Sequence, residues 1–179
     1  MKNFIMLLTY LRIIFGPLIF ILSVFFEMYL LSLIIFIICS VSDFFDGYLA
    51  RKFNKESSLG KLLDPIADKI LLCSAILSII LITNDYFIGL MGMLILIREF
   101  WVSGLREYTA THNIQGTSDV TYLAKIKTTL QFIAIGSYLF SFTYGLSLGI
   151  FISSFILFLS LLVSLKTGMT YTSNALRFK

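Results

Sequence analysis

The sequence predicts an all-α integral membrane protein with six transmembrane helices. Of its 179 residues, 58% are hydrophobic and only 13% are charged, and the mean hydropathy is +0.94. These values lie far outside the range of soluble domains. A chain of this length holds about six apolar segments of ~20 residues with short connections, which leaves little room for an extramembrane domain. We therefore expect a single membrane domain over residues 1–179.

Six apolar runs predict the spans. The residues before the first span, including Lys2, predict a short interfacial helix at the N-terminus. No A-x-A cleavage site follows the first run, so we expect a retained helix and not a signal peptide. Cys39 and Cys73 sit singly in apolar runs, which predicts free thiols and no disulfide. The predicted spans are Leu11–Phe26, Tyr29–Ala50, Leu62–Ile82, Tyr86–Leu105, Tyr122–Phe142 and Leu146–Leu165.

Basic residues predict the orientation of these spans. All 14 Lys and Arg fall toward one side: near the N-terminus, in segments 51–69 and 98–127, and from Lys166 onward. The opposite turns, such as those at Glu27 and Asn84, contain none. The positive-inside rule then places both termini and the basic loops in the cytoplasm. The net charge of +4 fits attraction to anionic lipid and requires no nucleic-acid partner.

Four aspartates interrupt the apolar pattern at the ends of the second and third spans: Asp43, Asp46, Asp64 and Asp68. The members of the two pairs are three and four residues apart, so each pair occupies one helix face. Asp43 and Asp68 each lie 16 residues from the nearest outer turn. On antiparallel helices the pairs therefore meet at one height, about 24–30 Å from the outer surface.

Carboxylates at this depth repel one another and are costly to bury, so we expect a cation between them. All-oxygen ligands favour Mg²⁺ or Mn²⁺, and two ions about 4 Å apart are typical of phosphoryl-transfer sites. The alternative is a solvated collar in which the aspartates pair with neighbouring cations. The matched height and shared faces favour the metal site. The cations available for a collar are Arg51, Lys52, Lys61 and Lys69.

The segment around the aspartates resembles the signature of the CDP-alcohol phosphatidyltransferases. It reads Asp43-x2-Asp46-Gly47-x2-Ala50-Arg51-x8-Gly60-x3-Asp64-x3-Asp68. Eight fixed residues, each with a chance of about one in twenty, make coincidence negligible. Two more segments resemble the family: LTYLRIIFGP at 8–17 and DPIADK at 64–69. Three others are similar to its bacterial phosphatidylglycerophosphate synthases, the last of them loosely: REFWVSGLREY at 98–108, KIKTT at 125–129 and TGMTY at 167–171.

The resemblance implies the CDP-alcohol phosphatidyltransferase fold in a homodimeric enzyme of the bacterial cytoplasmic (inner) membrane. Such an enzyme transfers the phosphatidyl group of CDP-diacylglycerol to sn-glycerol 3-phosphate and releases CMP. By position, the four aspartates would hold two divalent cations, Mg²⁺ or Mn²⁺, and Asp68 would also be the general base. The CDP moiety would lie against Gly47, Ala50 and Arg51, since a nucleotide needs close backbone approach and a phosphate-facing cation.

The dianionic acceptor requires cations near the acidic cluster. Arg98 lies deep in the fourth span, level with Asp43 when both are counted from the outer turns. We expect four residues to bind the acceptor phosphate, the last three of them nearer the cytosol. The alternative is that these side chains snorkel toward the lipid headgroups and that Glu99 neutralises Arg98. The four expected ligands are Arg98, Arg106, Lys125 and Lys127.

Two other functions stay open. The first is the same chemistry with serine, inositol phosphate or phosphatidylglycerol as acceptor. The second is a small cation-transporting or ion-sensing membrane protein, which discontinuous helices or inverted repeats would favour; the sequence shows no internal symmetry. Thr9 and Arg12 could approach the nucleotide or anchor the chain at the interface. His112 lies in a polar stretch and is expected to be solvated.

Overall fold

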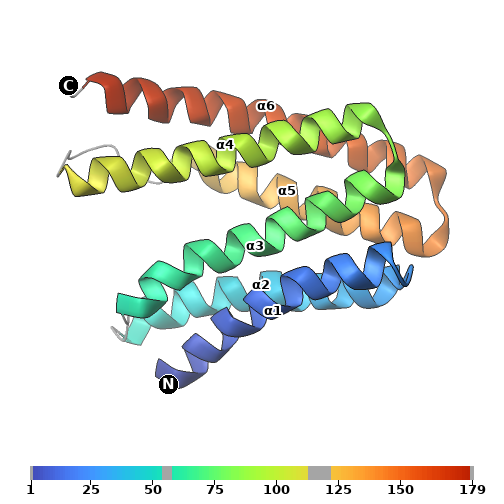
Figure 1. The fold of residues 1–179 in the computed structure, drawn as a ribbon, viewed down its shortest axis with the longest axis horizontal. Helices are drawn as coiled ribbons and strands as arrows, with labels where there is room; N and C mark the ends of the chain where they lie inside the picture. The colour runs from blue at the N-terminus through green and yellow to red at the C-terminus, as the bar shows by residue number, and fades with distance from the viewer. Residues whose placement is uncertain (1, 54–57, 113–121, 178–179) are drawn as a thin grey trace.

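The computed structural model describes residues 2–53, 58–112 and 122–177. Within these ranges the chain is all-helical (Figure 1). The backbone of Asp43, Asp46, Gly47, Ala50 and Arg51 is helical, and their side chains lie outside what the structure describes. The helices are α1 (Lys2–Val24), α2 (Tyr29–Phe53), α3 (Ser58–Thr83), α4 (Tyr86–Thr111), α5 (Tyr122–Tyr144) and α6 (Ser147–Arg177).

Three tight turns join the helices at one end of the molecule, opposite both termini (Figure 1). Each turn contains a residue in the left-handed region: Glu27 (φ 54°), Asn84 (φ 48°) and Gly145 (φ 62°). Such a residue lets the chain reverse within a few positions. Asp85 then caps α4, since its Oδ1 accepts a hydrogen bond from the Phe87 amide at 2.7 Å. The predicted turns between spans one and two, three and four, and five and six are therefore confirmed.

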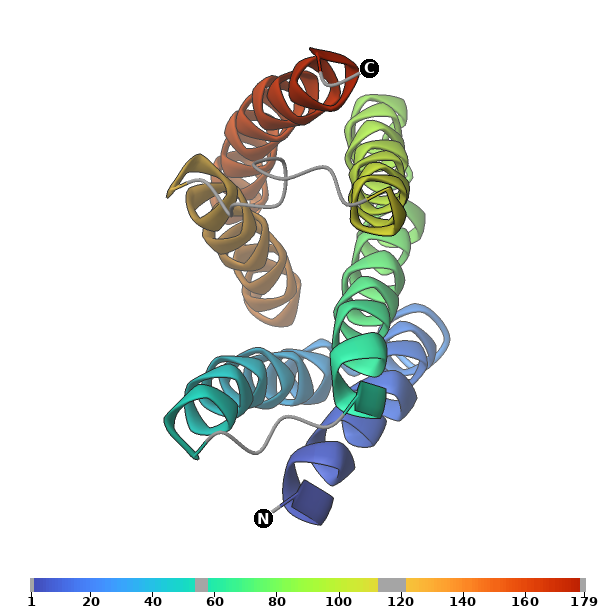
Figure 2. The ribbon, with the colours of Figure 1, turned by 90° about the vertical axis from the view of Figure 1, so that its left-hand side faces the viewer.

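The helices form a closed ring in the order α1, α2, α5, α6, α4, α3 (Figure 2). α1 packs most extensively against α3, and α5 against α6, while α3 also contacts α5 across the ring. Apolar side chains from all six helices build a continuous core, including Phe36, Leu71, Ile95, Ile135 and Leu157. Burial of this surface and the close packing of the side chains hold the ring together.

Large apolar side chains also cover the outer surface of the ring, for example Ile14, Leu81 and Phe151. A soluble monomer rarely exposes apolar surface on this scale. Within the described residues, four helical segments are long and apolar enough to cross a bilayer: Met6–Val24, Leu62–Thr83, Tyr86–Thr111 and Ser147–Ala175. The protein is therefore a multi-pass membrane protein, and the predicted count of six spans is not confirmed. α5 is absent from these four, and its first half carries Lys125, Lys127 and Gln131.

The N-terminal segment differs from the expectation. The sequence predicts a short interfacial helix before the first span, whereas α1 runs unbroken from Lys2 to Val24. No glycine or proline precedes Gly16, so nothing in the local sequence separates the first turns from the rest of the helix. The expected separate element is therefore the first part of α1.

Candidate functional site

A cavity of about 370 Å³ opens between α3, α4 and α5. Its walls combine charged and polar side chains with a few apolar ones, and its charged residues include Asp68 of α3, Arg98 and Arg106 of α4, and Lys127 of α5. These four residues were predicted from the sequence to belong to one site. The full lining is Pro65, Asp68, Lys69, Leu72, Arg98, Glu99, Val102, Ser103, Arg106, Lys127, Thr128, Gln131 and Phe132.

The acidic side of the site is organised by α1. Arg12 is only 1% exposed, and its Nη1 donates to Oδ1 of Asp68 at 2.5 Å while its Nη2 lies 3.6 Å from Oδ1 of Asp64. Thr9, one turn earlier on the same face, donates its hydroxyl to the same Asp64 oxygen at 2.7 Å. The contact between α1 and α3 therefore carries a polar seam as well as apolar packing.

The aspartates themselves stay accessible, since the side chains of Asp64 and Asp68 are 40% and 43% exposed. They project from successive turns of α3 and offer the hard oxygen ligands that Mg²⁺ and Mn²⁺ prefer. The chemistry of these two ligands fits a divalent cation. Asp43 and Asp46, the other two expected ligands, have side chains outside the described residues, so a four-aspartate metal site stays a prediction.

The geometry does not match the alternative in which the aspartates form a solvated collar with neighbouring cations. It paired the aspartates with cations from the same stretch of sequence, and the structure pairs Asp64 and Asp68 with Arg12 from another helix. Lys69, one of the cations expected in the collar, donates a hydrogen bond from its ammonium group to the Ser103 hydroxyl on α4. Arg51, Lys52 and Lys61 have side chains outside the described part of the chain.

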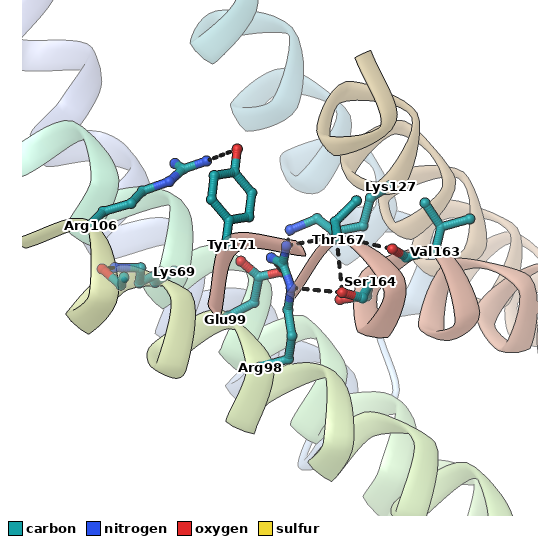
Figure 3. Close-up of polar contacts among 10 residues, drawn as sticks. Lys69, Arg98, Glu99, Arg106, Lys127, Val163, Ser164, Thr167 and Tyr171 are labelled. Carbon is teal, nitrogen blue, oxygen red and sulfur yellow. Dashed lines mark hydrogen bonds and ion pairs between the residues drawn. The ribbon is translucent and has the colours of Figure 1, made fainter. Parts of the chain in front are cut away.

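Arg98 is a buried cation of the cavity and is held from three directions (Figure 3). Its Nε donates to the Ser164 carbonyl at 2.9 Å, and its Nη2 donates to the Thr167 hydroxyl at 2.8 Å, both on α6. Its Nη1 lies 3.3 Å from Oε1 of Glu99. These bonds fix the plane of the guanidinium, as a planar donor group allows and an ammonium would not.

Glycine at position 168 makes this placement possible. A Cβ built there would lie 3.1 Å from Cγ and 3.4 Å from Nε of Arg98. Such contacts are tighter than ordinary van der Waals packing, so a larger residue would displace the arginine. The absence of a side chain at Gly168 therefore lets α6 close over Arg98.

Glu99 joins two of the cations, because Lys127 of α5 donates to the same Oε1 that Arg98 approaches (Figure 3). Arg98 and Lys127 are both buried, and buried charges require such compensation. The alternative in which Glu99 pairs with Arg98 is thus observed. It does not neutralise the cavity, because one carboxylate is shared between two cations.

Arg106 and Lys125 differ in their placement. Arg106 stands nearer the C-terminal end of α4, donates from Nη2 to the Tyr171 hydroxyl at 2.9 Å and lies over that ring, with Cζ 4.9 Å from its centroid. Lys125 is exposed and lies outside the lining residues of the cavity. The structure therefore brings together three of the four expected phosphate ligands and leaves Lys125 apart.

Several residues of the site were missed from the sequence. Ser164, Thr167 and Tyr171 are spaced by three and four residues on α6, with Gly168 directly after Thr167, and this is the spacing of one helix face. A row of small and polar residues on one face of an otherwise apolar helix was the sequence pattern that could have identified them. Gln131 follows Lys127 by one turn on α5 and lines the same cavity.

A second hollow, of about 640 Å³, lies on the outer side of Arg98 between α4 and α6. Its walls are mostly apolar, and they include Leu94, Ile97, Leu165 and Met169. Its larger volume does not make it the reaction site, because within its described lining it offers neither a carboxylate nor a second cation beside Arg98.

Comparisons with known proteins agree with the geometry. Residues 3–166 match the family model of the CDP-alcohol phosphatidyltransferases. The chain is similar to the CDP-diacylglycerol–glycerol-3-phosphate 3-phosphatidyltransferase of Wigglesworthia glossinidia brevipalpis, with 38% identity over 135 residues, covering 73% of this chain and 74% of that protein. Proteins of the same name from Rickettsia felis (39% over 142 residues, 79% and 76% coverage) and Salmonella choleraesuis (34% over 133 residues, 72% and 72%) are also similar.

Proposed function

Because the chain belongs to the CDP-alcohol phosphatidyltransferase family, we propose that it transfers the phosphatidyl group of CDP-diacylglycerol to the primary hydroxyl of sn-glycerol 3-phosphate. The products are phosphatidylglycerophosphate and CMP. One observation carries this choice of acceptor: Asp68 and the cations Arg98 and Lys127, from three different helices, line one cavity. A carboxylate beside a cluster of cations suits a substrate that has a hydroxyl at one end and a phosphate at the other.

The charge of the cavity matches this acceptor. Its lining contains four cations and two carboxylates, an excess of two positive charges. A phosphate monoester carries about −1.5 to −2 charges at neutral pH, so the acceptor and the cavity compensate each other. The planar guanidinium groups of Arg98 and Arg106 suit the oxygens of such a phosphate. Serine would leave most of this positive charge without a partner.

Asp68 is the proposed general base. It accepts the proton of the attacking hydroxyl, the oxygen forms a bond to the phosphorus of the phosphatidyl group, and the bond from that phosphorus to CMP breaks. General-base help of this kind is typically worth about 10²–10⁴ in rate. Arg12 orients the carboxylate through its 2.5 Å hydrogen bond. We propose direct in-line transfer, because the described lining contains no cysteine or histidine and its one serine, Ser103, accepts a hydrogen bond from the Lys69 ammonium and so has no base to take its proton.

The metal and nucleotide sites complete the proposal. Asp64 and Asp68, with Asp43 and Asp46, would hold two Mg²⁺ or Mn²⁺ ions, which when bound would offset charge on the leaving CMP and on the transferred group. Gly47, Ala50 and Arg51 would contact the CDP moiety. The support for the α2 residues is their position in the family signature, as their side chains lie outside the described residues.

We further infer a single-domain enzyme of the bacterial inner membrane, with six spans, cytoplasmic termini and a homodimeric assembly. The support for orientation is that all basic residues fall toward one side of the membrane by sequence, whereas the three tight turns lie at the end opposite both termini (Figure 1). The support for the dimer is the family resemblance alone. Each described helix is continuous, so the broken helices that would favour a cation transporter are not seen in this part of the chain.

The test is an acceptor comparison with the purified full-length protein. CDP-diacylglycerol and Mg²⁺ are supplied with sn-glycerol 3-phosphate, serine, inositol phosphate or phosphatidylglycerol, and CMP release is measured. We expect release with glycerol 3-phosphate and not with the other three. Release with serine but not with glycerol 3-phosphate would overturn the assignment.

A further inference from the structure

Gln131 is a buried amide that the site described so far does not use. Its side chain is 1% exposed and lines the cavity. Neither its Oε1 nor its Nε2 has a hydrogen-bond partner among the described residues. Buried side-chain amides are nearly always bonded, so an amide with both ends unpaired calls for an explanation.

The position of Gln131 is set by α5. It follows Lys127 by four residues and therefore shares its helix face. It lies 13 residues before the end of α5 at Tyr144, and Arg98 lies 12 residues after the start of α4 at Tyr86. Because both helix ends belong to the turns at the same end of the molecule, Gln131 and Arg98 stand at nearly the same depth.

The charged residues near Gln131 already pair with one another, so none of them needs the amide as a partner. Glu99 already forms ion pairs with Lys127 and Arg98. The other lining residues at this depth include the apolar Leu72 and Phe132. Arginine and lysine only donate hydrogen bonds, whereas an amide both donates and accepts. Gln131 therefore adds an uncharged acceptor to a part of the cavity whose charged groups are two cations and the one carboxylate that they share.

A phosphate dianion alone would use only the donor of this amide, because its oxygens accept and carry no proton to give. sn-Glycerol 3-phosphate presents both kinds of group side by side, a hydroxyl on C2 and the phosphate on C3. We propose that Gln131 determines acceptor specificity by recognising this pair: its Oε1 accepts from the C2 hydroxyl while its Nε2 donates to a phosphate oxygen. This proposal rests on the proposed function and adds to it the part of the acceptor that the protein recognises, the C2 hydroxyl beside the phosphate.

The experiment compares two acceptors that differ only at C2. sn-Glycerol 3-phosphate has the hydroxyl, and 3-hydroxypropyl phosphate keeps the primary hydroxyl and the phosphate but lacks it. We expect the wild-type protein to show a kcat/KM about tenfold higher for glycerol 3-phosphate, the scale of one hydrogen bond to a buried group. In Gln131→Met, which keeps the length of the side chain without the amide, this preference should fall to about one.

Gln131→Glu provides the second readout. It retains an acceptor for the C2 hydroxyl, loses the donor and adds negative charge near the phosphate. We expect kcat/KM to fall for both acceptors while the preference for glycerol 3-phosphate persists. Ser141→Ala is the matched control, since Ser141 is a buried polar residue of the same helix that bonds the Ser137 carbonyl near the opposite end, and it should change neither value.

The outcomes separate the two proposals. If the wild-type protein uses glycerol 3-phosphate but shows no preference over the C2-deoxy analogue, the specificity role is overturned and the proposed function stands. The same holds if Gln131→Met slows both acceptors equally, which is what a packing role or a buried water would produce. If the wild-type protein releases no CMP with glycerol 3-phosphate, the proposed function fails and the specificity role fails with it.

Discussion

Arg12 of α1 donates a hydrogen bond to Asp68 of α3 at 2.5 Å, although none of the four aspartates lies on α1. The same guanidinium lies 3.6 Å from Asp64, so one buried cation of α1 stands beside two half-exposed carboxylates of α3. It supplies part of the positive charge that these carboxylates need to stand so close together. It also ties the first helix to the site, because its side chain spans the contact between α1 and α3.

Replacing Arg12 with glutamine should lower both stability and activity. The loss removes the buried cation beside two carboxylates that lie one turn apart on α3, and we expect a destabilisation of about 1–2 kcal/mol, less than for a fully buried pair because the aspartates are partly exposed. CMP release should fall by about tenfold or more as Asp68 loses its orientation. Thermal unfolding in detergent and turnover measure the two effects. Lys166→Gln, which removes an exposed cation of α6, should alter neither.

Asp68→Asn should abolish CMP release. The substitution keeps the shape of the side chain but removes its basicity and one of the expected metal ligands, so we expect a fall of at least about 10²-fold. Expression level and membrane insertion should remain near those of the wild-type protein, whereas the unfolding temperature should fall somewhat because the buried Arg12 loses one of its ion-pair partners. Substantial turnover in this variant would exclude Asp68 as the base.

Gly168→Ala should weaken acceptor binding without unfolding the protein. The new Cβ would lie 3.1 Å from Cγ of Arg98 and displace the guanidinium by a few tenths of an ångström. We expect the KM for glycerol 3-phosphate to rise about fivefold, since small displacements of positioning groups are costly. Gly104→Ala is the matched control on α4, where a Cβ meets nothing within 4 Å. An equal KM in both variants would contradict the role given to Arg98.

Arg106→Gln should raise the KM for glycerol 3-phosphate by about tenfold and leave kcat less affected, because it removes a charge that holds the phosphate in the ground state and the transition state alike. Tyr171→Phe removes the 2.9 Å hydrogen bond and keeps the ring under the guanidinium, so its effect should be only about twofold to threefold. Steady-state kinetics at varied acceptor concentration distinguish the variants. A Tyr171→Phe effect as large as that of Arg106→Gln would assign the phosphate contact to the tyrosine.

Each of the six predicted apolar segments overlaps one helix in the described part of the chain, and three turns lie where they were predicted, because both follow from local composition. That all six helices span the membrane is not confirmed. The helix ends were harder to predict: the fourth span was expected to end at Leu105 and the sixth at Leu165, whereas α4 continues to Thr111 and α6 to Arg177. Hydropathy marks the part of a helix that lies in lipid. It does not mark where the backbone stops being helical, and no proline stops either helix at its expected end.

The charged residues of the site were predicted to different degrees. Arg98, Arg106 and Lys127 were found because their depth and type suit a phosphate. Lys125 was expected with them, but it lies two residues from Lys127 and therefore points to a different side of α5. The pairing of Arg12 with Asp68, and that of Glu99 with Lys127, depend on how separate helices cross. Spacing within one helix carries no information about that.

The three tight turns at one end of the ring have a consequence for the bilayer as a whole. The reactive groups gather toward the end that carries the termini, and the turns at the other end contain no cation that would attract a headgroup. A lipid with a phosphorylated headgroup crosses the hydrocarbon layer only at great cost. If the proposed site and orientation hold, new anionic lipid would therefore be released into the leaflet at the end that carries the termini.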